Sequence, residues 1–472
     1  MSEHQLGSEE RPLRVAVVGA GPAGFYAAEA LLKHKELKIE VDLFERLPFP
    51  FGLVRFGVAP DHQKIKTAAV AYERTAELEG FRFLGNVELG RDIGFDELRA
   101  CYHQVVITTG AAGDRKMRIP GEELAGSLPA TEFVGWYNGH PDFQGLKLDL
   151  SGQRAVVVGV GDVTTDVVRL LLRSRDELAK TDITRASLEV LRQSRIREVV
   201  VLGRRGPEQL KMAVKELKQI AEDPQISVVI DPQQLADARR RVDAAPDRYD
   251  STTLKRLDLM AAIARGELGQ PGRAGSMRFA FLRSPKQLEG DGKVERCVVE
   301  KNTLVPAGDD FKARGTGELE TLETNLVLRS IGYVGTPLEG LPFDERSNVI
   351  PNHEGRVMQD GEPLCGVYVS GWIKRGATGV IGTNRADSVA TVHTMIGDVL
   401  NACQGQPCLA AGAAEATHTA AAVDALLEQR GVRVVSWEDW KRLDQHEQDQ
   451  GKQAGKVREK LIDVEEALRQ IS

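Results

Sequence analysis

Two glycine-rich turns carry the residue types that bind the pyrophosphate of a dinucleotide. Gly19, Gly21 and Gly24 stand between an apolar run and a helix-like segment, and Gly159 and Gly161 repeat the pattern later in the chain. Glycines at these spacings allow a tight turn, a close approach of backbone N–H groups to phosphate oxygens, and close packing of a helix on a sheet. The two turns therefore predict two dinucleotide sites.

An acidic residue distinguishes the first site. Glu45 follows Gly24 at about the spacing expected for a side chain at the end of the second strand of such a unit. A carboxylate there accepts hydrogen bonds from ribose hydroxyls and disfavours a 2′-phosphate. The first site is therefore predicted to hold FAD or NAD and not NADP.

Two arginines distinguish the second site. Arg204 and Arg205 stand in the run GRRGP, after the second strand of the second unit, where an acidic residue would otherwise be expected. Guanidinium groups bind a phosphate through charge-assisted, often bidentate, hydrogen bonds. This site is therefore predicted to hold NADP.

The second turn also departs from the usual pattern. Asp162 would place a carboxylate beside the pyrophosphate, and Thr164 stands where Gly or Ala usually permits close helix packing. Asp162 could cap the following helix through its backbone N–H groups, or it could interfere with the phosphates. The residues alone leave both alternatives open.

The elements that must position these turns read as two βαβ units. Each turn follows a continuous apolar run, the pattern of a parallel strand buried on both faces, and precedes a helix-like segment. The expected strands are Leu13–Val18 and Ile39–Phe44 in the first unit, and Arg154–Val158 and Glu198–Leu202 in the second. The fold class predicted is α/β, with two doubly wound Rossmann-like dinucleotide-binding domains.

Two further strand-and-turn segments, Val105–Ala111 and Leu326–Tyr333, flank the second unit. If the chain crosses between the two layers there, the first domain is discontinuous. We expect the first part of an FAD-binding domain at 1–111, an NADP-binding domain at 112–329, and the second part of the FAD-binding domain with a C-terminal extension at 330–472. The end of that extension, Arg458–Ile471, has helical spacing and is expected to serve packing.

Composition excludes several other classes of protein. The 472 residues include 69 acidic and 62 basic side chains, a net charge of −7, which disfavours a nucleic-acid-coating protein. The longest charge-free apolar run, Val15–Ala28, is interrupted by glycines and is shorter than the roughly 18 residues of a membrane span. Five cysteines without framework spacing suit a reduced cytosol, and we expect a cytoplasmic protein with no membrane partner.

Three longer runs resemble the adrenodoxin-reductase-like branch of the ferredoxin-NADP reductases. They are FPFGLVRFGVAPDHQKIK at Phe49–Lys66, GRRGP at Gly203–Pro207 and GWIKRGATGVIGTNRAD at Gly371–Asp387. The resemblance extends over most of the chain. It implies hydride transfer from NADPH to FAD, followed by one-electron steps to a ferredoxin-type iron-sulfur protein, a small acidic electron carrier.

The resemblance also implies roles for individual residues. His62 and Trp372 match catalytic positions near the flavin. The FAD-contacting positions are Gly19, Gly21, Gly24, Glu45, Leu53, Val87, Trp372, Gly379, Val380 and Ile381. The NADP-contacting positions are Arg115, Gly159, Gly161, Asp162, Arg204, Arg205 and Glu216, and no metal site is implied.

Other activities of the same fold remain as alternatives. Asp162-Val163-Thr164 stands where the family commonly has Asn-Val-Ala, and Met212-Ala213 stands where it has Phe-Thr. The main alternative is therefore a protein of the same fold with weakened nicotinamide binding, either a flavin-binding module or an oxidoreductase with another acceptor. A disulfide reductase would need a redox cysteine pair near the flavin. The only close pair, Cys403 and Cys408, lies in an Ala- and Gly-rich connector.

Overall fold

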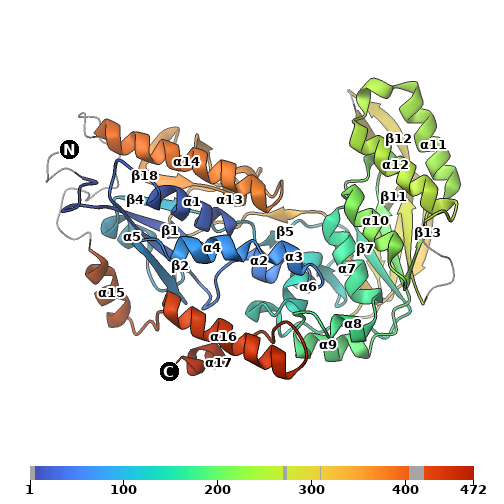
Figure 1. Cartoon of the computed structure of the whole chain (residues 1–472). Coiled ribbons are helices and arrows are strands. Elements are labelled where there is room, and N and C mark those ends of the chain that lie inside the picture. The colour runs from blue at the N-terminus through green and yellow to red at the C-terminus, as the bar shows by residue number, and fades with distance from the viewer. Residues whose placement is uncertain (1–5, 269–273, 309, 403–418, 472) are drawn as a thin grey trace.

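A computed structural model describes residues 6–268, 274–308, 310–402 and 419–471. Two α/β domains lie side by side, and the C-terminal helices run along one side of them (Figure 1). The Cys403–Cys408 pair lies outside the described residues.

The first domain is built on a seven-stranded sheet with the order β16-β17-β18-β4-β1-β2-β3. Strands β18, β4, β1, β2 and β3 are parallel, and β16 and β17 extend the sheet in antiparallel pairing. Every residue of β1 is buried, as its continuous apolar run predicts, and its single charge, Arg14, donates to Asp42 on β2 at 2.7 Å. The strands are β1 Leu13–Val18, β2 Ile39–Glu45, β3 Phe81–Gly85, β4 Gln104–Ile107, β16 Asn352–His353, β17 Arg356–Gln359 and β18 Glu362–Val369.

Helices from both ends of the chain belong to this domain. Helix α1 packs against β2 and the long α14, and it also contacts α4. The helices are α1 Pro22–Leu32, α2 Leu53–Phe56, α3 Gln63–Lys66, α4 Ala69–Ala76, α5 Phe95–Cys101, α13 Trp372–Arg375 and α14 Ile381–Ala402. Because β1–β4 and β16–β18 share one sheet, the first domain is discontinuous in sequence, as expected.

The second domain is built on a six-stranded parallel sheet with the order β6-β14-β7-β8-β10-β9. Its strands are β6 Ser127–Pro129, β7 Arg154–Val158, β8 Glu198–Gly203, β9 Ile226–Val229, β10 Gly275–Phe281 and β14 Leu326–Arg329. Its helices are α6 Ala130–Tyr137, α7 Asp162–Leu172, α8 Arg175–Leu178, α9 Arg185–Arg192, α10 Val214–Glu222, α11 Pro232–Ala244 and α12 Ser251–Ala264, with 3₁₀ turns at Pro141–Phe143, Pro207–Gln209 and Pro246–Arg248. Both expected doubly wound layers are therefore confirmed.

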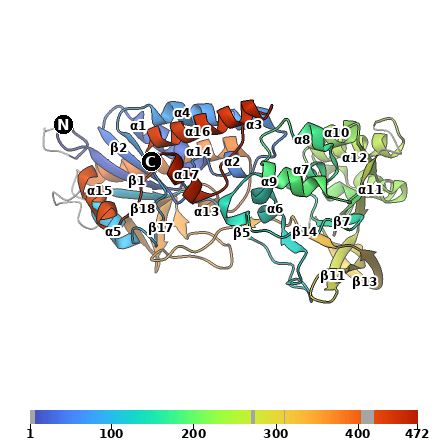
Figure 2. The same cartoon turned by 90° about the horizontal axis from the view of Figure 1, so that it is seen from below.

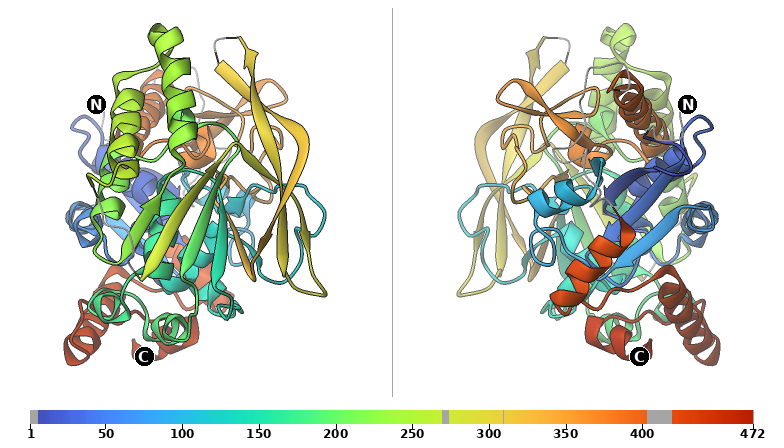
Figure 3. Two further views of the ribbon diagram at one scale, coloured as in Figure 1. Left: turned by 90° about the vertical axis from the view of Figure 1, so that its right-hand side faces the viewer. Right: turned by 90° about the vertical axis from the view of Figure 1, so that its left-hand side faces the viewer.

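A three-stranded antiparallel sheet, β11-β12-β13, accompanies the second domain and stands beside its parallel sheet (Figure 3). It consists of β11 Arg283–Glu289, β12 Arg296–Ala307 and β13 Asp310–Glu323. No pattern noted in the sequence predicted this sheet.

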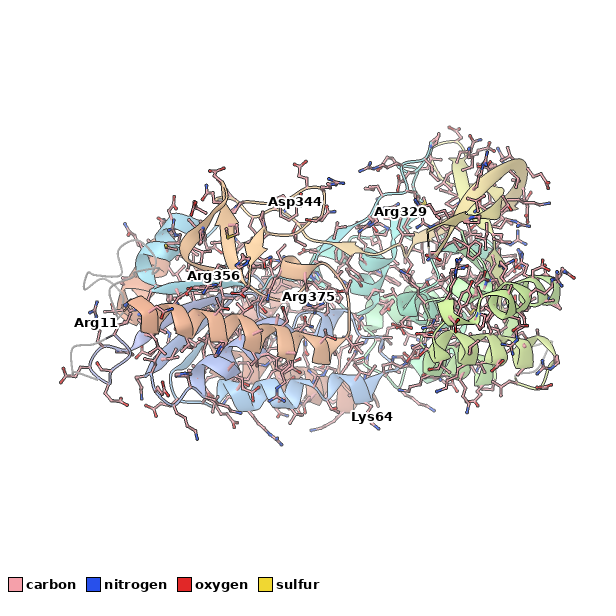
Figure 4. The ribbon with its side chains drawn as sticks, turned by 90° about the horizontal axis from the view of Figure 1, so that it is seen from above. Arg11, Lys64, Arg329, Asp344, Arg356 and Arg375 are labelled. Atoms are coloured by element: carbon pink, nitrogen blue, oxygen red, sulfur yellow. The ribbon has the colours of Figure 1, made fainter. Side chains whose placement is uncertain are left out.

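Two short strands connect the domains. β5 Gly113–Asp114 follows β4, β15 Tyr333–Val334 follows β14, and the two pair in antiparallel fashion. Arg329, at the end of β14 (Figure 4), fixes this connection by donating to Asp114 at 3.0 Å and to Ser127 at 3.1 Å. The domain boundaries expected near residues 111 and 329 stay predictions.

The C-terminal extension consists of α15 Ala420–Gln429, α16 Trp437–Gln453 and α17 Val464–Gln470. In Figures 1 and 2, α16 lies along α2, α3 and α4 of the first domain. The prediction of a helix from Arg458 onward is wrong for its first six residues, because the last helix begins only at Val464, where Asp463 caps it. Among the helices described, none is both long and apolar enough to serve as a membrane span.

Candidate functional site

The first glycine turn joins β1 to α1 and leaves its backbone open to a ligand. Gly19 has φ +110°, and a Cβ there would lie 2.8 Å from the carbonyl oxygen of Thr108. A Cβ on Gly24 would lie 2.1 Å from the Gly19 carbonyl oxygen, so both positions need glycine for packing. A Cβ on Gly21 would meet no atom within 4 Å. The absence of a side chain at Gly21 therefore serves an approach from outside the protein, at the positive end of α1.

Glu45 and Val87 lie together beside this turn. The carboxylate of Glu45 accepts the N–H of Ala20 at 3.1 Å and the N–H of Leu47 at 3.2 Å. Burial raises the pKa of Glu45, while Arg46 and the backbone donors oppose the shift. The N–H of Val87 donates to the carbonyl oxygen of Glu45 at 2.9 Å. The predicted ribose acceptor thus stands at the end of β2, one strand from the glycine turn.

The loop before α2 closes over the same turn. The N–H of Phe51 donates to the carbonyl oxygen of Ala20 at 2.8 Å, and a Cβ on Gly52 would lie 3.0 Å from the Cα of Gly21. Phe51 has φ +84°, an unfavourable conformation for a residue with a side chain, and such strain is concentrated at functional sites. Leu53 begins α2 directly after this loop.

The segment around α13 reaches the turn from the far end of the chain. A Cβ on Gly371 would lie 2.7 Å from the Cβ of Ala23 on α1. The next residue, Trp372, donates its indole N–H to the carbonyl oxygen of Thr378 at 3.1 Å and lies with its ring centre 5.5 Å from that of Tyr333. Because Tyr333 belongs to β15, Trp372 lies where the connection between the domains meets the first site.

Gly379, Val380 and Ile381 form the entry to α14. The N–H of Val380 donates to the Thr383 hydroxyl at 3.1 Å, yet the Val380 side chain is 71% exposed. Arg375 holds this loop by donating to Asn384 at 2.8 Å and is labelled in Figure 4. An apolar side chain held outward at a fixed loop is suited to contact a flat apolar ring.

The second glycine turn repeats the geometry of the first. Gly159 has φ +130°, and a Cβ there would lie 2.0 Å from the carbonyl oxygen of Ser330, whereas a Cβ on Gly161 would meet nothing within 4 Å. Thr164 is buried, and its hydroxyl donates to the Gly159 carbonyl oxygen at 3.0 Å. The second turn therefore has a hydrogen bond from Thr164 at the position where, in the first turn, Gly24 packs directly against the backbone of Gly19.

Asp162 is the first residue of α7, and the structure decides part of its role. The N-cap residue is Gly161, and no side chain caps the helix, so the capping alternative is wrong. The carboxylate instead accepts the N–H of Ala213 at 2.6 Å, which ties the turn to the start of α10. The charge itself still lies at the N-terminal end of α7.

Arg204 and Arg205 follow β8, beside this second turn. Arg204 is exposed, and its carbonyl oxygen accepts the side-chain amide of Asn302 at 2.9 Å. Arg205 donates to Asp310 of β13 at 2.6 Å. The arginine turn is thus supported by the antiparallel sheet, and Arg204 is the more accessible guanidinium. Arg115 lies elsewhere, with its N–H bonded to Gly332 in the connection between the domains at 3.3 Å.

A buried charged cluster joins the two domains. The guanidinium of Arg169, on α7, donates to Asp61 at 2.8 Å and lies 2.9 Å from Nε2 of His62, and Glu216 of α10 lies 3.4 Å from it. Burial and Arg169 lower the pKa of His62. Burial raises the pKa of Asp166, which also accepts from Arg169, to about 7 despite that neighbour. The predicted residues His62 and Glu216 are therefore brought together, from different domains.

Three members of this cluster, Asp61, Asp166 and Arg169, are not among the predicted site residues. Their only local signal is the spacing of Asp166 and Arg169, one helical turn apart. Nitrogen and oxygen atoms of His62, Asp166 and Glu216 lie within 4.8 Å of one another, a spacing that could suit a metal ion. The Arg169 guanidinium already supplies the positive charge there, which disfavours a second cation.

The topology makes the two turns face each other. Each turn lies at the carboxyl edge of its sheet, and the connecting strands β5 and β15 leave from the carboxyl ends of β4 and β14. Because β5 and β15 pair, the two carboxyl edges are directed toward one junction. Ligands of open α/β sheets bind at such edges. Two nucleotides bound in these turns would extend toward each other across the junction.

The residues present fit two nucleotides. Each turn presents an open glycine position and a helix N-terminus, one with a carboxylate beside it and the other with guanidinium groups. This donor set is suited to FAD in the first site and to NADP in the second.

Comparisons with known proteins agree with this fold. A family model described as pyridine nucleotide-disulphide oxidoreductase matches residues 13–223. The chain is 44% identical to NADPH-ferredoxin reductase FprA of Mycobacterium tuberculosis, over 97% of this chain and 99% of that protein. It is 42% identical to the mitochondrial NADPH:adrenodoxin oxidoreductase of Homo sapiens, over 99% of this chain and 93% of that protein. A solved structure of Mycobacterium tuberculosis FprA in complex with NADPH superimposes with a TM-score of 0.90 and 44% identity, covering 98% of this chain and 100% of that one.

Proposed function

Because this chain belongs to the family of NADPH-ferredoxin and NADPH:adrenodoxin reductases, we propose that it is an FAD-dependent oxidoreductase that passes electrons from NADPH to a ferredoxin-type iron-sulfur protein. The resemblance seen in its motifs is thus confirmed at the level of the family. The observation that carries the proposal is the pair of glycine turns at facing sheet edges, one beside Glu45 and the other beside Arg204. FAD held in the first site would supply the conversion of a two-electron donor to a one-electron donor.

The first turn would hold the FAD pyrophosphate. Backbone N–H groups at Gly21 and the N-terminus of α1 would donate to its oxygens, and Glu45 would accept from the ribose hydroxyls. Leu53 and Val87 would contact the cofactor from the loops that close over this turn. The open position at Gly21 and the strained loop at Phe51 support this assignment.

The segment Gly379–Ile381 and Trp372 would lie against the flavin ring. The outward side chain of Val380 supports this assignment. The contact between Trp372 and Tyr333 supports it as well, because Tyr333 belongs to the connection between the domains. His62, held neutral by its lowered pKa, would orient the nicotinamide side of the junction rather than donate a proton. Hydride transfer depends on the alignment of the two rings, and no protein nucleophile is required.

The second turn would hold the NADP pyrophosphate at Gly161 and the N-terminus of α7. Arg204, with Arg205 beside it, would bind the 2′-phosphate. Glu216, which lies beside Arg169 in the buried cluster, would contact the nicotinamide end of the nucleotide. Arg115, in the connection, would lie along the path between the two nucleotides. The exposure of Arg204 supports the selection of NADP over NAD.

The electron acceptor would be a small acidic iron-sulfur protein, and we propose a cytoplasmic location. The described cysteines Cys101 and Cys297 are free, as a reducing compartment permits. The names of the relatives identify ferredoxin and adrenodoxin as the acceptors of those proteins.

An anaerobic titration tests the proposal. The purified protein loaded with FAD is mixed with NADPH or NADH, and flavin absorbance is followed before a ferredoxin is added. We expect bleaching by NADPH at far lower concentration than by NADH, then reoxidation of the flavin by oxidised ferredoxin. Flavin absorbance that neither nucleotide changes would favour the alternative of a flavin-binding module with weakened nicotinamide binding.

A further inference from the structure

Residues 456–461, which we call the C-terminal strap, cross from the first domain to the second. The strap follows α16 and precedes α17 and forms neither helix nor strand. The loop after α16 reaches the region of α6 and α9 in Figure 1. Its polar side chains are directed into the boundary between the domains, which is unusual for a surface connection.

The strap is fastened to the first domain through a buried carboxylate. Glu447 of α16 has no exposed side-chain surface and accepts two hydrogen bonds from Arg55 of α2, at 2.9 and 2.5 Å. It also accepts the N–H of Leu461 at 2.8 Å and Arg458 at 3.1 Å. The Arg55 guanidinium lies 4.6 Å from the ring centre of Phe49. The geometry of Arg55, two residues after Leu53 in the first site, is therefore fully determined.

Lys460 joins this assembly to the second domain. Its side chain is 2% exposed, and its Nζ donates to the carbonyl oxygens of Arg55 and Asn138, both at 3.1 Å. Asn138 ends α6 of the second domain. The carboxylate of Asp182, between α8 and α9, lies 3.4 Å from the same ammonium. A single buried side chain of the strap thus contacts both domains.

Two further strap residues bind the second domain. Glu459 accepts the N–H of Arg185 at 2.9 Å, and Lys456 donates to the carbonyl oxygen of Ile183. These contacts all fall on the segment that opens α9.

The chemistry of this boundary favours a role in alignment. Burying an ammonium group costs free energy that apolar residues of the same size would not cost, so its presence here is weak evidence for a role in stability. Domains of one chain otherwise move relative to each other. Hydride transfer requires the two rings to be held within a narrow range of distance and orientation.

We propose that Lys460 is a positioning residue that sets the placement of the nicotinamide site of the second domain against the flavin site of the first. The inference rests on the proposed function, since it assigns one of the conditions for transfer between the two sites. Lys460 acts through Arg55 and Asn138 and touches neither nucleotide turn.

The test compares Lys460→Met with a matched control in FAD-loaded full-length protein. Methionine keeps the length of the side chain and removes the ammonium. The control is Arg356→Met, which removes a cation bonded to Asp398 at 2.7 and 2.8 Å within the first domain alone (Figure 4). The milder Glu459→Gln keeps the test open if Lys460→Met does not fold.

Three quantities are measured in each protein: the limiting rate of flavin bleaching at saturating NADPH, the dissociation constant of NADPH, and amide hydrogen exchange at the end of α6. Because a misplacement of about 1 Å costs up to about 100-fold in rate, we expect Lys460→Met to bleach roughly 10- to 100-fold more slowly with an almost unchanged dissociation constant. Amide hydrogen exchange at residues 136–139 should become faster in Lys460→Met. Glu459→Gln should slow flavin bleaching and speed this amide exchange by less, and Arg356→Met should change neither.

A purely stabilising role gives a different result. In that case Lys460→Met would lower the melting temperature while its folded, flavin-loaded fraction bleached at the rate of the unaltered protein, and the proposal would be overturned. Equal slowing by Arg356→Met would overturn it as well. If the unaltered protein is not bleached by NADPH, the proposed function fails, whereas the exchange at α6 still decides whether Lys460 holds the domains together.

Discussion

The two open glycine positions allow one cofactor to be removed without the other. Gly21 and Gly161 have φ values of −85° and −98° with extended ψ, which alanine adopts without strain. A Cβ at either position meets no protein atom within 4 Å. Gly21→Ala and Gly161→Ala should therefore fold, with a stability unchanged or higher by up to about 1 kcal/mol.

The added methyl groups would stand between each backbone turn and its pyrophosphate. The loss of one charge-assisted hydrogen bond costs about 1.5–3 kcal/mol, or roughly 10- to 150-fold in affinity. We expect Gly161→Ala to raise the dissociation constant of NADPH by that factor while FAD stays bound. Gly21→Ala should lose FAD on gel filtration.

Flavin content and NADPH titration of the two variants provide the assay, with thermal unfolding to verify that both fold. As a steric control, Gly159→Ala should impair folding itself, because its Cβ would lie 2.0 Å from the Ser330 carbonyl oxygen. If Gly21→Ala weakened NADPH and Gly161→Ala released FAD, the assignment of the two turns would be reversed. If neither variant changed binding, the pyrophosphates would not lie at these turns.

Three further predictions concern charges around the second site. Arg204→Ala should weaken NADPH by ~1.5–3 kcal/mol and leave NADH unchanged, and equal losses for both nucleotides in a titration would refute its role at the 2′-phosphate. Asp162→Ala should tighten NADPH by removing a negative charge near the phosphates, and should cost about 1 kcal/mol in denaturant unfolding for the lost bond to Ala213; weaker NADPH binding would contradict this. Because Asp166 has a pKa of about 7 when folded and an ordinary value of 3.8 when unfolded, the folded state holds the extra proton between these values, so the free energy of unfolding should fall as pH rises from about 4 to about 7. Asp166→Asn should lose this part of the slope, and an identical pH profile would show that Asp166 does not titrate there.

Local patterns made much of the first site predictable. Gly19, Gly21 and Gly24 are followed by Glu45 at a spacing fixed by one helix and one strand, so the distance along the chain translates directly into position in space. The expected strand Leu13–Val18 coincides with β1 for the same reason, since a strand buried on both faces requires a continuous apolar run.

Contacts between distant segments could not be predicted in this way. Asp162 bonds to Ala213, 51 residues away, and Arg205 bonds to Asp310, 105 residues away. The strap escaped prediction because its helical spacing is overridden by buried partners, among them Arg55, 405 residues from Lys460. Such pairings depend on how the two domains meet, and no spacing in a single segment encodes that.

We propose that one chain holds a flavin and a nicotinamide nucleotide in adjacent sites and passes electrons between them. The decisive measurement is an anaerobic visible spectrum of the FAD-loaded protein before and after one equivalent of NADPH. We expect a yellow protein whose flavin absorbance disappears on mixing, at a rate independent of protein concentration once NADPH is bound. A protein that takes up no flavin, or one whose bound flavin keeps its colour in excess NADPH, would contradict it.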